Sequence, residues 1–219
     1  MPPAAEGGEA ASQICFWSGA QLAGAIRART LTAAAALEAV LAQRDRCHPA
    51  TNAVVVINAD AARARAAAAD AAAARGEWWG PLHGVPMTVK ENISVAGLKS
   101  PTLGRLEAST DEPAAQSEPL VAKLLAAGAV VYGKTNLPVD VADWQSYNPV
   151  YGTCRNPWDL GRTPGGSSGG SAAALASGQT PLEVGGDIGA CWRAASHGLP
   201  GRAQLLSCFP RHLLPLWSR

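Results

Sequence analysis

Short apolar stretches with strand character alternate along this chain with segments of helical period. Helices are expected to begin at Ser18 and at Thr32 and to cover 60–75, 117–127 and 171–177; strands are expected at 53–57, 86–89, 129–132 and 182–184. The many alanines of 60–75 favour a helix intrinsically. Alternation of this kind predicts a layered α/β core in which helices flank a parallel or mixed sheet.

A glycine- and serine-rich segment interrupts this pattern. Residues 162–171 read Arg-Thr-Pro-Gly-Gly-Ser-Ser-Gly-Gly-Ser, and small residues continue to Gly178. Glycines let a backbone bring bare amide groups and hydroxyls close to an anion or a polarised carbonyl. A phosphate-binding P-loop would need a lysine at the end of the segment, and none lies within it. A flexible linker is the alternative, but Gly/Ser linkers do not normally lie between a turn and an alanine-rich helix.

Three other motifs accompany this segment. They are Gly-Val-Pro-Met-Thr-Val-Lys-Glu-Asn at 84–92, Gly-Lys-Thr-Asn at 133–136 and Asn-Pro-Trp-Asp-Leu at 156–160. Together the four motifs resemble the amidase signature family, whose members hydrolyse or transfer the acyl group of carboxamides with a Ser-Ser-Lys triad. The resemblance runs from about Leu82 to Gly189, and it implies an amidase-signature-type core with a mixed sheet.

The resemblance gives two residues a catalytic role. Lys90 ends a predicted strand and corresponds to the general base of the family; burial favours this role because it disfavours the ammonium form of a lysine. Ser167 corresponds to the serine that carries a cis peptide bond and passes a proton between the lysine and the nucleophile. We therefore expect Lys90 Nζ and Ser167 Oγ to lie within hydrogen-bonding reach. Ser168 and Ser171 are expected to cap the following helix or to pack at its first turn.

The nucleophile position differs from the family pattern. The family serine lies twenty-four positions after the shuttle serine, where this chain has Cys191. The backbone amides of Ile188, Gly189, Ala190 and Cys191 are expected to form the oxyanion hole, although Ala190 replaces a glycine and its Cβ opposes the required turn. Two readings stay open. A neighbouring base can convert a thiol into a nucleophilic thiolate, but a site tuned for oxygen does not automatically suit sulfur.

Five further polar residues fall in matching segments and are expected to brace the glycine-rich loop: Asn136, Asp143, Gln145, Asn156 and Arg162. An ion pair with Asp187 is the alternative role for Arg162. Beyond Cys191 only Arg193 matches the family. We therefore expect the N-terminal half of an amidase domain at 18–193 and a divergent tail at 194–219 that reads as out of frame. Residues 1–17 are rich in Pro, Gly and Ala and are expected to be disordered. The α/β core is then incomplete at its C-terminus.

Composition narrows the classes of function. The formal net charge of +1 argues against a nucleic-acid binder. Five cysteines, an odd number without paired ligand spacing, argue against a disulfide framework and a metal site. No secretory signal is evident, and Lys123 interrupts the best candidate for a membrane span. We expect a cytoplasmic protein without a cofactor, whose partner is a small-molecule amide; the oligomeric state stays open.

The function expected from the sequence is hydrolysis of a carboxamide C–N bond through an acyl-enzyme intermediate, weak or absent in this chain. Two alternatives remain, a non-catalytic remnant of an interrupted amidase gene and an amidotransferase subunit.

Overall fold

A five-stranded mixed sheet forms the centre of the molecule. The computed structural model describes residues 13–186 and the backbone of residues 205–208. The strands are β1 (Val54–Ile57), β2 (Pro86–Lys90), β3 (Val130–Thr135), β6 (Glu183–Gly186) and β7 (Leu205–Cys208), in the spatial order β1-β3-β2-β6-β7. β1 runs antiparallel to β3, and the other neighbouring pairs are parallel. The expected α/β class with a mixed sheet is therefore confirmed.

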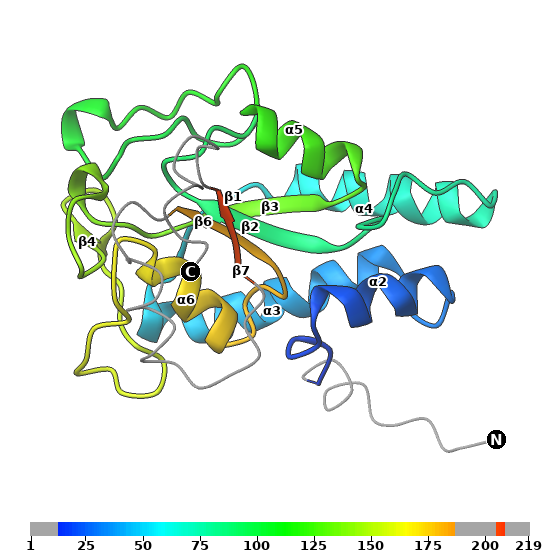
Figure 1. Ribbon diagram of the computed structural model, residues 1–219, viewed down its shortest axis with the longest axis horizontal. Coiled ribbons are helices and arrows are strands. Elements are labelled where there is room, and N and C mark those ends of the chain that lie inside the picture. The colour runs from blue at the N-terminus through cyan, green and yellow to red at the C-terminus, as the bar shows by residue number, and fades with distance from the viewer. Residues whose placement is uncertain (1–12, 187–204, 209–219) are drawn as a thin grey trace, which may run out of the picture.

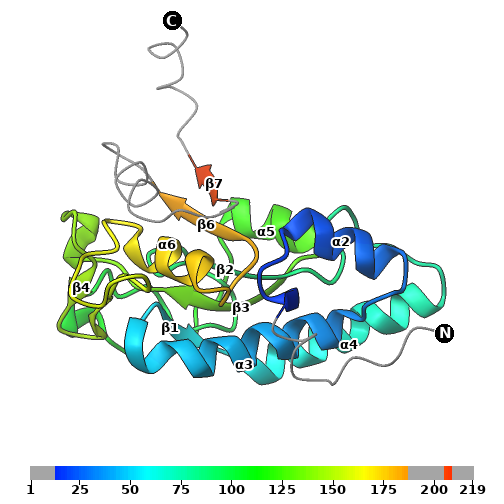
Figure 2. The same cartoon turned by 90° about the horizontal axis from the view of Figure 1, so that it is seen from below.

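Helices cover both faces of this sheet (Figures 1 and 2). The α-helices are α2 (Gly19–Arg27), α3 (Ala33–Thr51), α4 (Ala59–Ala74), α5 (Pro119–Ala126) and α6 (Gly169–Ala176). The short elements are the 3-10 turns η1 (Leu106–Ala108) and η2 (Val139–Val141) and the hairpin strands β4 (Tyr147–Asn148) and β5 (Gly152–Thr153). Figure 1 shows α5 on one side of the sheet and α2, α3 and α6 on the other. None of the helices in the described part of the chain is long and apolar enough to cross a membrane.

Local sequence explains where the first helices begin. Ser18 and Gln21 form a reciprocal capping box at the start of α2. Thr32 accepts a hydrogen bond from the amide of Ala35 at the start of α3. Both start positions agree with the sequence-based expectation, because a side-chain oxygen can satisfy an amide that has no partner within the helix.

Two apolar clusters hold the layers together. One joins the inner faces of α2, α3, α4 and α6 to the sheet and is centred on Leu22, Leu37, Val54 and Tyr132. The other lies on the α5 side and contains Met87, Val89, Val121 and Val184. Side chains of a strand point alternately to the two faces of a sheet. Met87 and Val89 point to the α5 side, so the alternating residues Thr88 and Lys90 face α6.

Three parts of the structure differ from the expectations. β7 lies in the tail at 194–219, for which no regular structure was predicted; its strand conformation comes from pairing with β6, a tertiary contact that periodicity does not reveal. The β4–β5 hairpin was also missed, because its strands have two residues each. Residues 13–17 were expected to be disordered, but Cys15 is buried and its thiol donates to the Ala39 carbonyl. Residues 1–12 lie outside the described part of the chain.

Candidate active site

Lys90 and Ser167 meet in the interior although seventy-seven residues separate them. Lys90 is the last residue of β2, and Ser167 lies in the loop that leads into α6. Lys90 Nζ donates to Ser167 Oγ at 2.6 Å. The lysine is 0% exposed and the serine 1%. The expected contact is present, and the Gly166–Ser167 peptide bond is cis, as the resemblance implied.

Backbone packing fixes the glycine-rich loop. The amide of Gly170 donates to the Asn136 carbonyl at 3.2 Å. A Cβ on Gly170 would come within 2.8 Å of Asn136 Cα and still closer to the backbone nitrogen and oxygen of that residue. A second tie comes from Ser146, whose hydroxyl accepts from the Gly169 amide at 3.0 Å and donates to the Gly165 carbonyl at 3.2 Å. The loop therefore needs glycine at position 170 because another backbone lies against it.

Asn136 is the main brace among the residues expected in this role. Its side-chain amide donates to the carbonyls of Asn52 and Gly152, and its side-chain oxygen accepts from the Leu137 amide and from Asn148. Asn156 donates to the Thr163 carbonyl at 3.3 Å.

The other expected braces act locally. Asp143 accepts from the amides of Trp144 and Gln145, and Gln145 reaches the Cys154 carbonyl. The expectation for Arg162 was wrong: its side chain is 79% exposed and pairs with Asp159 at 3.0 Å. An arginine that far in solvent neither braces the loop nor forms a buried ion pair.

The two other serines of the loop differ in role. Ser168 occupies the position before α6 but makes no side-chain cap; its hydroxyl donates to the Gly186 carbonyl at 3.0 Å and accepts from the Gly186 amide at 3.3 Å. It thereby fastens the loop to the end of β6. Ser171 packs at the first turn of α6 and donates to Glu183 Oε1 at 3.0 Å. The expected capping by Ser168 is therefore replaced by a tie between loop and sheet.

A buried carboxyl lies beneath α6, on the same face of the sheet as Lys90. Glu183 of β6 is 0% exposed and accepts from the hydroxyls of Thr88, Thr135 and Ser171. Burial raises the pKa of Glu183 to about 7, while the three hydroxyl donors and the charge of Lys90 oppose the rise. Sequence analysis missed this residue. The available signal was a charged side chain within the predicted strand 182–184.

The candidate nucleophile and oxyanion hole lie outside the described residues. Ile188, Gly189, Ala190 and Cys191 fall in the segment 187–204. The described part of the candidate site therefore consists of the buried lysine, the serine that is hydrogen-bonded to it and the polar side chains around them. Within residues 13–186, no group of three or more His, Cys, Asp or Glu side chains is placed to hold a metal ion.

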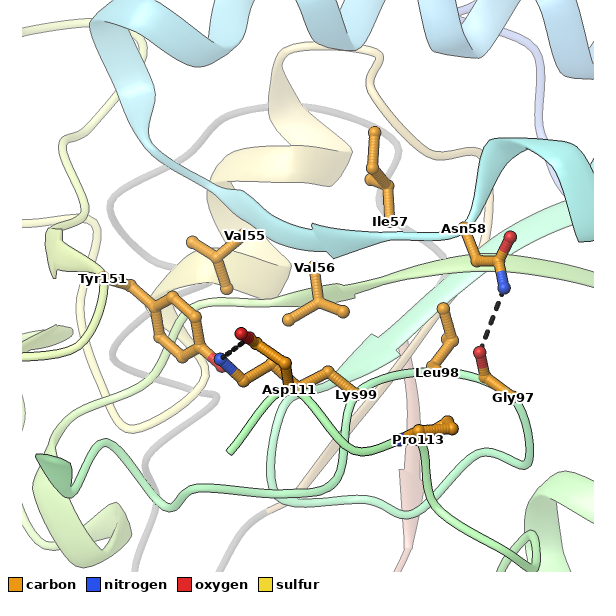
Figure 3. A pocket seen from close by; sticks show the side chains of 10 residues that line it. All are labelled: Val55, Val56, Ile57, Asn58, Gly97, Leu98, Lys99, Asp111, Pro113 and Tyr151. Atoms are coloured by element: carbon orange, nitrogen blue, oxygen red, sulfur yellow. Dashed lines mark hydrogen bonds and ion pairs between the residues drawn. The ribbon is translucent and has the colours of Figure 1, made fainter. Parts of the chain in front are cut away.

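A pocket of about 570 Å³ opens elsewhere, beside the edge strand β1 (Figure 3). Its lining residues are Val55, Val56, Ile57, Asn58, Gly97, Leu98, Lys99, Asp111, Pro113 and Tyr151. Figure 3 shows Lys99 paired with Asp111, and Asn58 bonded to the Gly97 carbonyl. Neither Lys90 nor Ser167 is among the described residues that line this pocket.

Comparison with known proteins gives a consistent result. The family model described as Amidase matches residues 35–198. The glutamyl-tRNA(Gln) amidotransferase of Anaeromyxobacter sp. (strain K) has a subunit that is 38% identical over 87% of this chain and 39% of its own length. Indoleacetamide hydrolase of Bradyrhizobium diazoefficiens is 40% identical over 83% of this chain and 34% of its own length.

Solved structures agree. A fatty acid amide hydrolase superposes with a TM-score of 0.79 and 28% identity over 84% of this chain and 32% of that one. The chain thus spans between about a third and two fifths of the length of these relatives.

Proposed function

The chain belongs to the amidase signature family, and on this basis we propose that it carries the proton-transfer machinery for cleaving a carboxamide C–N bond. The observation that carries the proposal is the 2.6 Å contact between Lys90 Nζ and Ser167 Oγ in a buried site. An amide is a poor electrophile with a poor leaving group, so its cleavage needs an activated nucleophile and a proton donor for the departing nitrogen. A buried lysine bonded to a serine hydroxyl supplies a route for both proton movements.

The reaction proceeds through an acyl-enzyme. Neutral Lys90 takes the proton of Ser167, which in turn takes the proton of the Cys191 thiol. The thiolate attacks the amide carbonyl, and the backbone amides of Ile188, Gly189 and Ala190 stabilise the oxyanion. The C–N bond then breaks as the proton returns from Lys90 through Ser167 to the nitrogen. Water, activated by the same pair, hydrolyses the thioester and restores the thiol.

We propose that turnover by this chain is weak or absent. Cys191 stands where the family has a serine, and sulfur is larger than the oxygen for which the site is shaped. Ala190 replaces a glycine, and its Cβ opposes the backbone conformation that aims the amides at the oxyanion. The proposed substrate is a small-molecule amide, and the proposed setting is the cytoplasm.

Ammonia release tests the proposal. Indole-3-acetamide is a suitable probe because one relative is named for acting on it. We expect Lys90→Met, Ser167→Ala and Cys191→Ala each to lower the rate at least about 100-fold, the usual contribution of a catalytic acid or base. Lys123→Met, which changes an exposed lysine, serves as the matched control. Full activity in Lys90→Met would contradict the proposal.

A second measurement does not need turnover. The rate of alkylation of Cys191 by iodoacetamide, mapped by mass spectrometry, is expected to fall in Lys90→Met because the thiolate loses its base. Cys15, Cys47 and Cys154 are internal references, since burial raises the pKa of each of these thiols. Equal alkylation of Cys191 in both proteins, together with no ammonia release, would instead support a non-catalytic remnant.

Membership of an amidotransferase complex is the other candidate function, supported by the 38% identity to a protein named as a component of such an enzyme. A component of this kind is expected to act only within its complex. If ammonia release appears only after the other components of such a system are added, and still depends on Lys90, this second function is the correct one.

A further inference from the structure

Glu183 is a buried ionisable group that the proposed reaction does not use. In the parallel ladder between β2 and β6 it lies opposite Thr88, and Lys90 follows two residues further along β2. Residues two apart on a strand point to the same face, so Thr88, Lys90 and Glu183 form one row beneath α6. Thr135 lies opposite Lys90 on β3 and completes this group.

The hydrogen bonds around Glu183 suit a carboxylate. Thr88 donates to Oε2, while Thr135 and Ser171 reach Oε1 at 2.8 and 3.0 Å. Each hydroxyl has one proton to give, and Thr135 and Ser171 also lie 3.0 Å from each other; an ionised carboxylate is the form that can accept from all three hydroxyls at once. A neutral carboxylic acid would itself donate one hydrogen bond, and one of these hydroxyls would have to rotate so that its oxygen accepts that bond. The site is therefore built to hold a negative charge in the interior, where an uncompensated charge is costly.

Within the described residues, Lys90 is a cation whose charge acts on Glu183. Glu183 is flanked in the sheet by Thr88 of β2 and Leu205 of β7, and it accepts from Thr135 of β3 and Ser171 of α6. α6 carries no titratable residue, and the cysteine of β7, Cys208, lies opposite Gly186 rather than Glu183. β3 contributes Tyr132, whose pKa is raised well above its usual value, mainly by burial and in part by the charge of Glu183. Lys134 of β3 lies opposite Val89 in the β2–β3 ladder, so its side chain is on the other face of the sheet, the α5 side. The positive charge of Lys90 opposes the upward shift of the Glu183 pKa.

We propose that Glu183 is a positioning residue whose carboxylate is the counter-charge of Lys90, so that the lysine can hold the proton that Ser167 delivers. The inference rests on the proposed function, in which Lys90 is the base. Burial alone weakens a lysine as a proton acceptor, and a carboxylate on the same face offsets that effect. The balance between the two decides how readily the base holds a proton.

Titration of Lys90 by NMR tests this proposal without turnover. The chain has four lysines, Lys90, Lys99, Lys123 and Lys134, so labelling lysine Cε with ¹³C gives four resonances, which Lys→Met variants assign. In Glu183→Gln the amide keeps the size of the side chain but cannot carry the charge. We expect the titration midpoint of Lys90 to fall by about one pH unit or more, because its ammonium loses the counter-charge.

The matched control is Glu91→Gln. Glu91 is equally buried, but it accepts from Thr102, Leu103 and Tyr151 rather than from the group beneath α6. We expect this variant to leave the Lys90 midpoint in place. If Glu183→Gln fails to fold, Thr88→Val replaces it; loss of one donor makes the carboxylate less stable, and a smaller shift in the same direction is expected.

Where turnover is measurable, the acid limb of the rate profile in Glu183→Gln should move down with the Lys90 midpoint, with kcat lowered and KM unchanged. An unmoved Lys90 midpoint in Glu183→Gln, or an equal shift in Glu91→Gln, would overturn the proposal, because a purely structural carboxyl changes stability without changing the titration of Lys90. Alkylation of Cys191 that does not depend on Lys90 would count against the proposed function, while the NMR titration still decides the role of Glu183.

Discussion

At the scale of single residues, close packing leaves some positions with no choice of side chain. Gly170 lies directly against the backbone of Asn136. Gly170→Ala should therefore displace the loop that carries Ser167 and lower the free energy of unfolding by about 1–3 kcal/mol, the usual cost of overpacking. Urea denaturation followed by circular dichroism measures this change.

Gly24→Ala is the matched control for this prediction. Gly24 lies within α2, and a Cβ there would meet no atom within 4 Å. Alanine is expected to stabilise the protein by about 0.5–1 kcal/mol, because glycine loses more backbone entropy on folding. Equal effects of the two substitutions would mean that the contact with Asn136 does not limit residue 170.

At the scale of elements, one helix is capped by another. The carboxylate of Asp70 in α4 accepts from the amides of Ala33 and Ala34 in the first turn of α3, at 2.7 and 3.0 Å. Asp70→Ala leaves both amides without this acceptor and removes a negative charge from the positive end of the helix.

We expect Asp70→Ala to cost about 1–3 kcal/mol in thermal or chemical unfolding. Asp45→Ala is the control, because that side chain is 70% exposed and its partner is the neighbouring Arg44; its effect should stay within about 0.5 kcal/mol. A loss no larger than that of the control would rule out a capping role for Asp70.

The same scale shows what the sequence could predict. The strand at 86–89 and the helices that begin at Ser18 and Thr32 follow from local apolar patterns and caps, and they agree with the structure. The contact between Lys90 and Ser167 was foreseen because both residues belong to a recognised motif.

Other parts of the fold depend on contacts that local patterns do not contain. β7 is a strand because it pairs with β6, and Asp70 is a cap because α4 lies across the start of α3. Ser146 braces the glycine-rich loop because it contacts Gly169, and Glu183 lies beneath α6 because of the face of the sheet to which it points. Neither residue belongs to a motif. The roles of Cys191 and of the amides before it stay predictions, since they lie outside the described residues.

At the scale of the whole molecule, a buried lysine should make stability depend on pH. Lys134 is 0% exposed, lies on the α5 side of the sheet and donates to the Lys99 carbonyl at 3.1 Å. Burial lowers the pKa of Lys134 from 10.5 to about 8, although the charges of Glu91 and Glu118 oppose the shift. In the unfolded chain the lysine returns to its ordinary value.

The sign follows from proton counting. Between about pH 8 and 10.5, unfolded Lys134 holds a proton that the folded protein has released, so the free energy of unfolding rises with pH in this window. Below pH 8 both states are protonated, and the contribution is lost. Other groups titrate in the same range in the unfolded chain, including Cys154, whose ordinary pKa of 9.0 burial raises to about 12 in the fold. The measurement must therefore be a difference between wild type and a Lys134 variant, in which these common contributions cancel.

We expect the unfolding free energy of wild type minus that of Lys134→Met to be flat below pH 8 and to rise by up to about 3 kcal/mol toward pH 10.5. Urea titrations at intervals across this range give the difference curve. Lys123→Met is the control: its lysine is exposed, so the corresponding curve should stay flat throughout. A flat curve for Lys134→Met as well would show that Lys134 keeps its proton in the fold, with Glu91 and Glu118 compensating its burial in full.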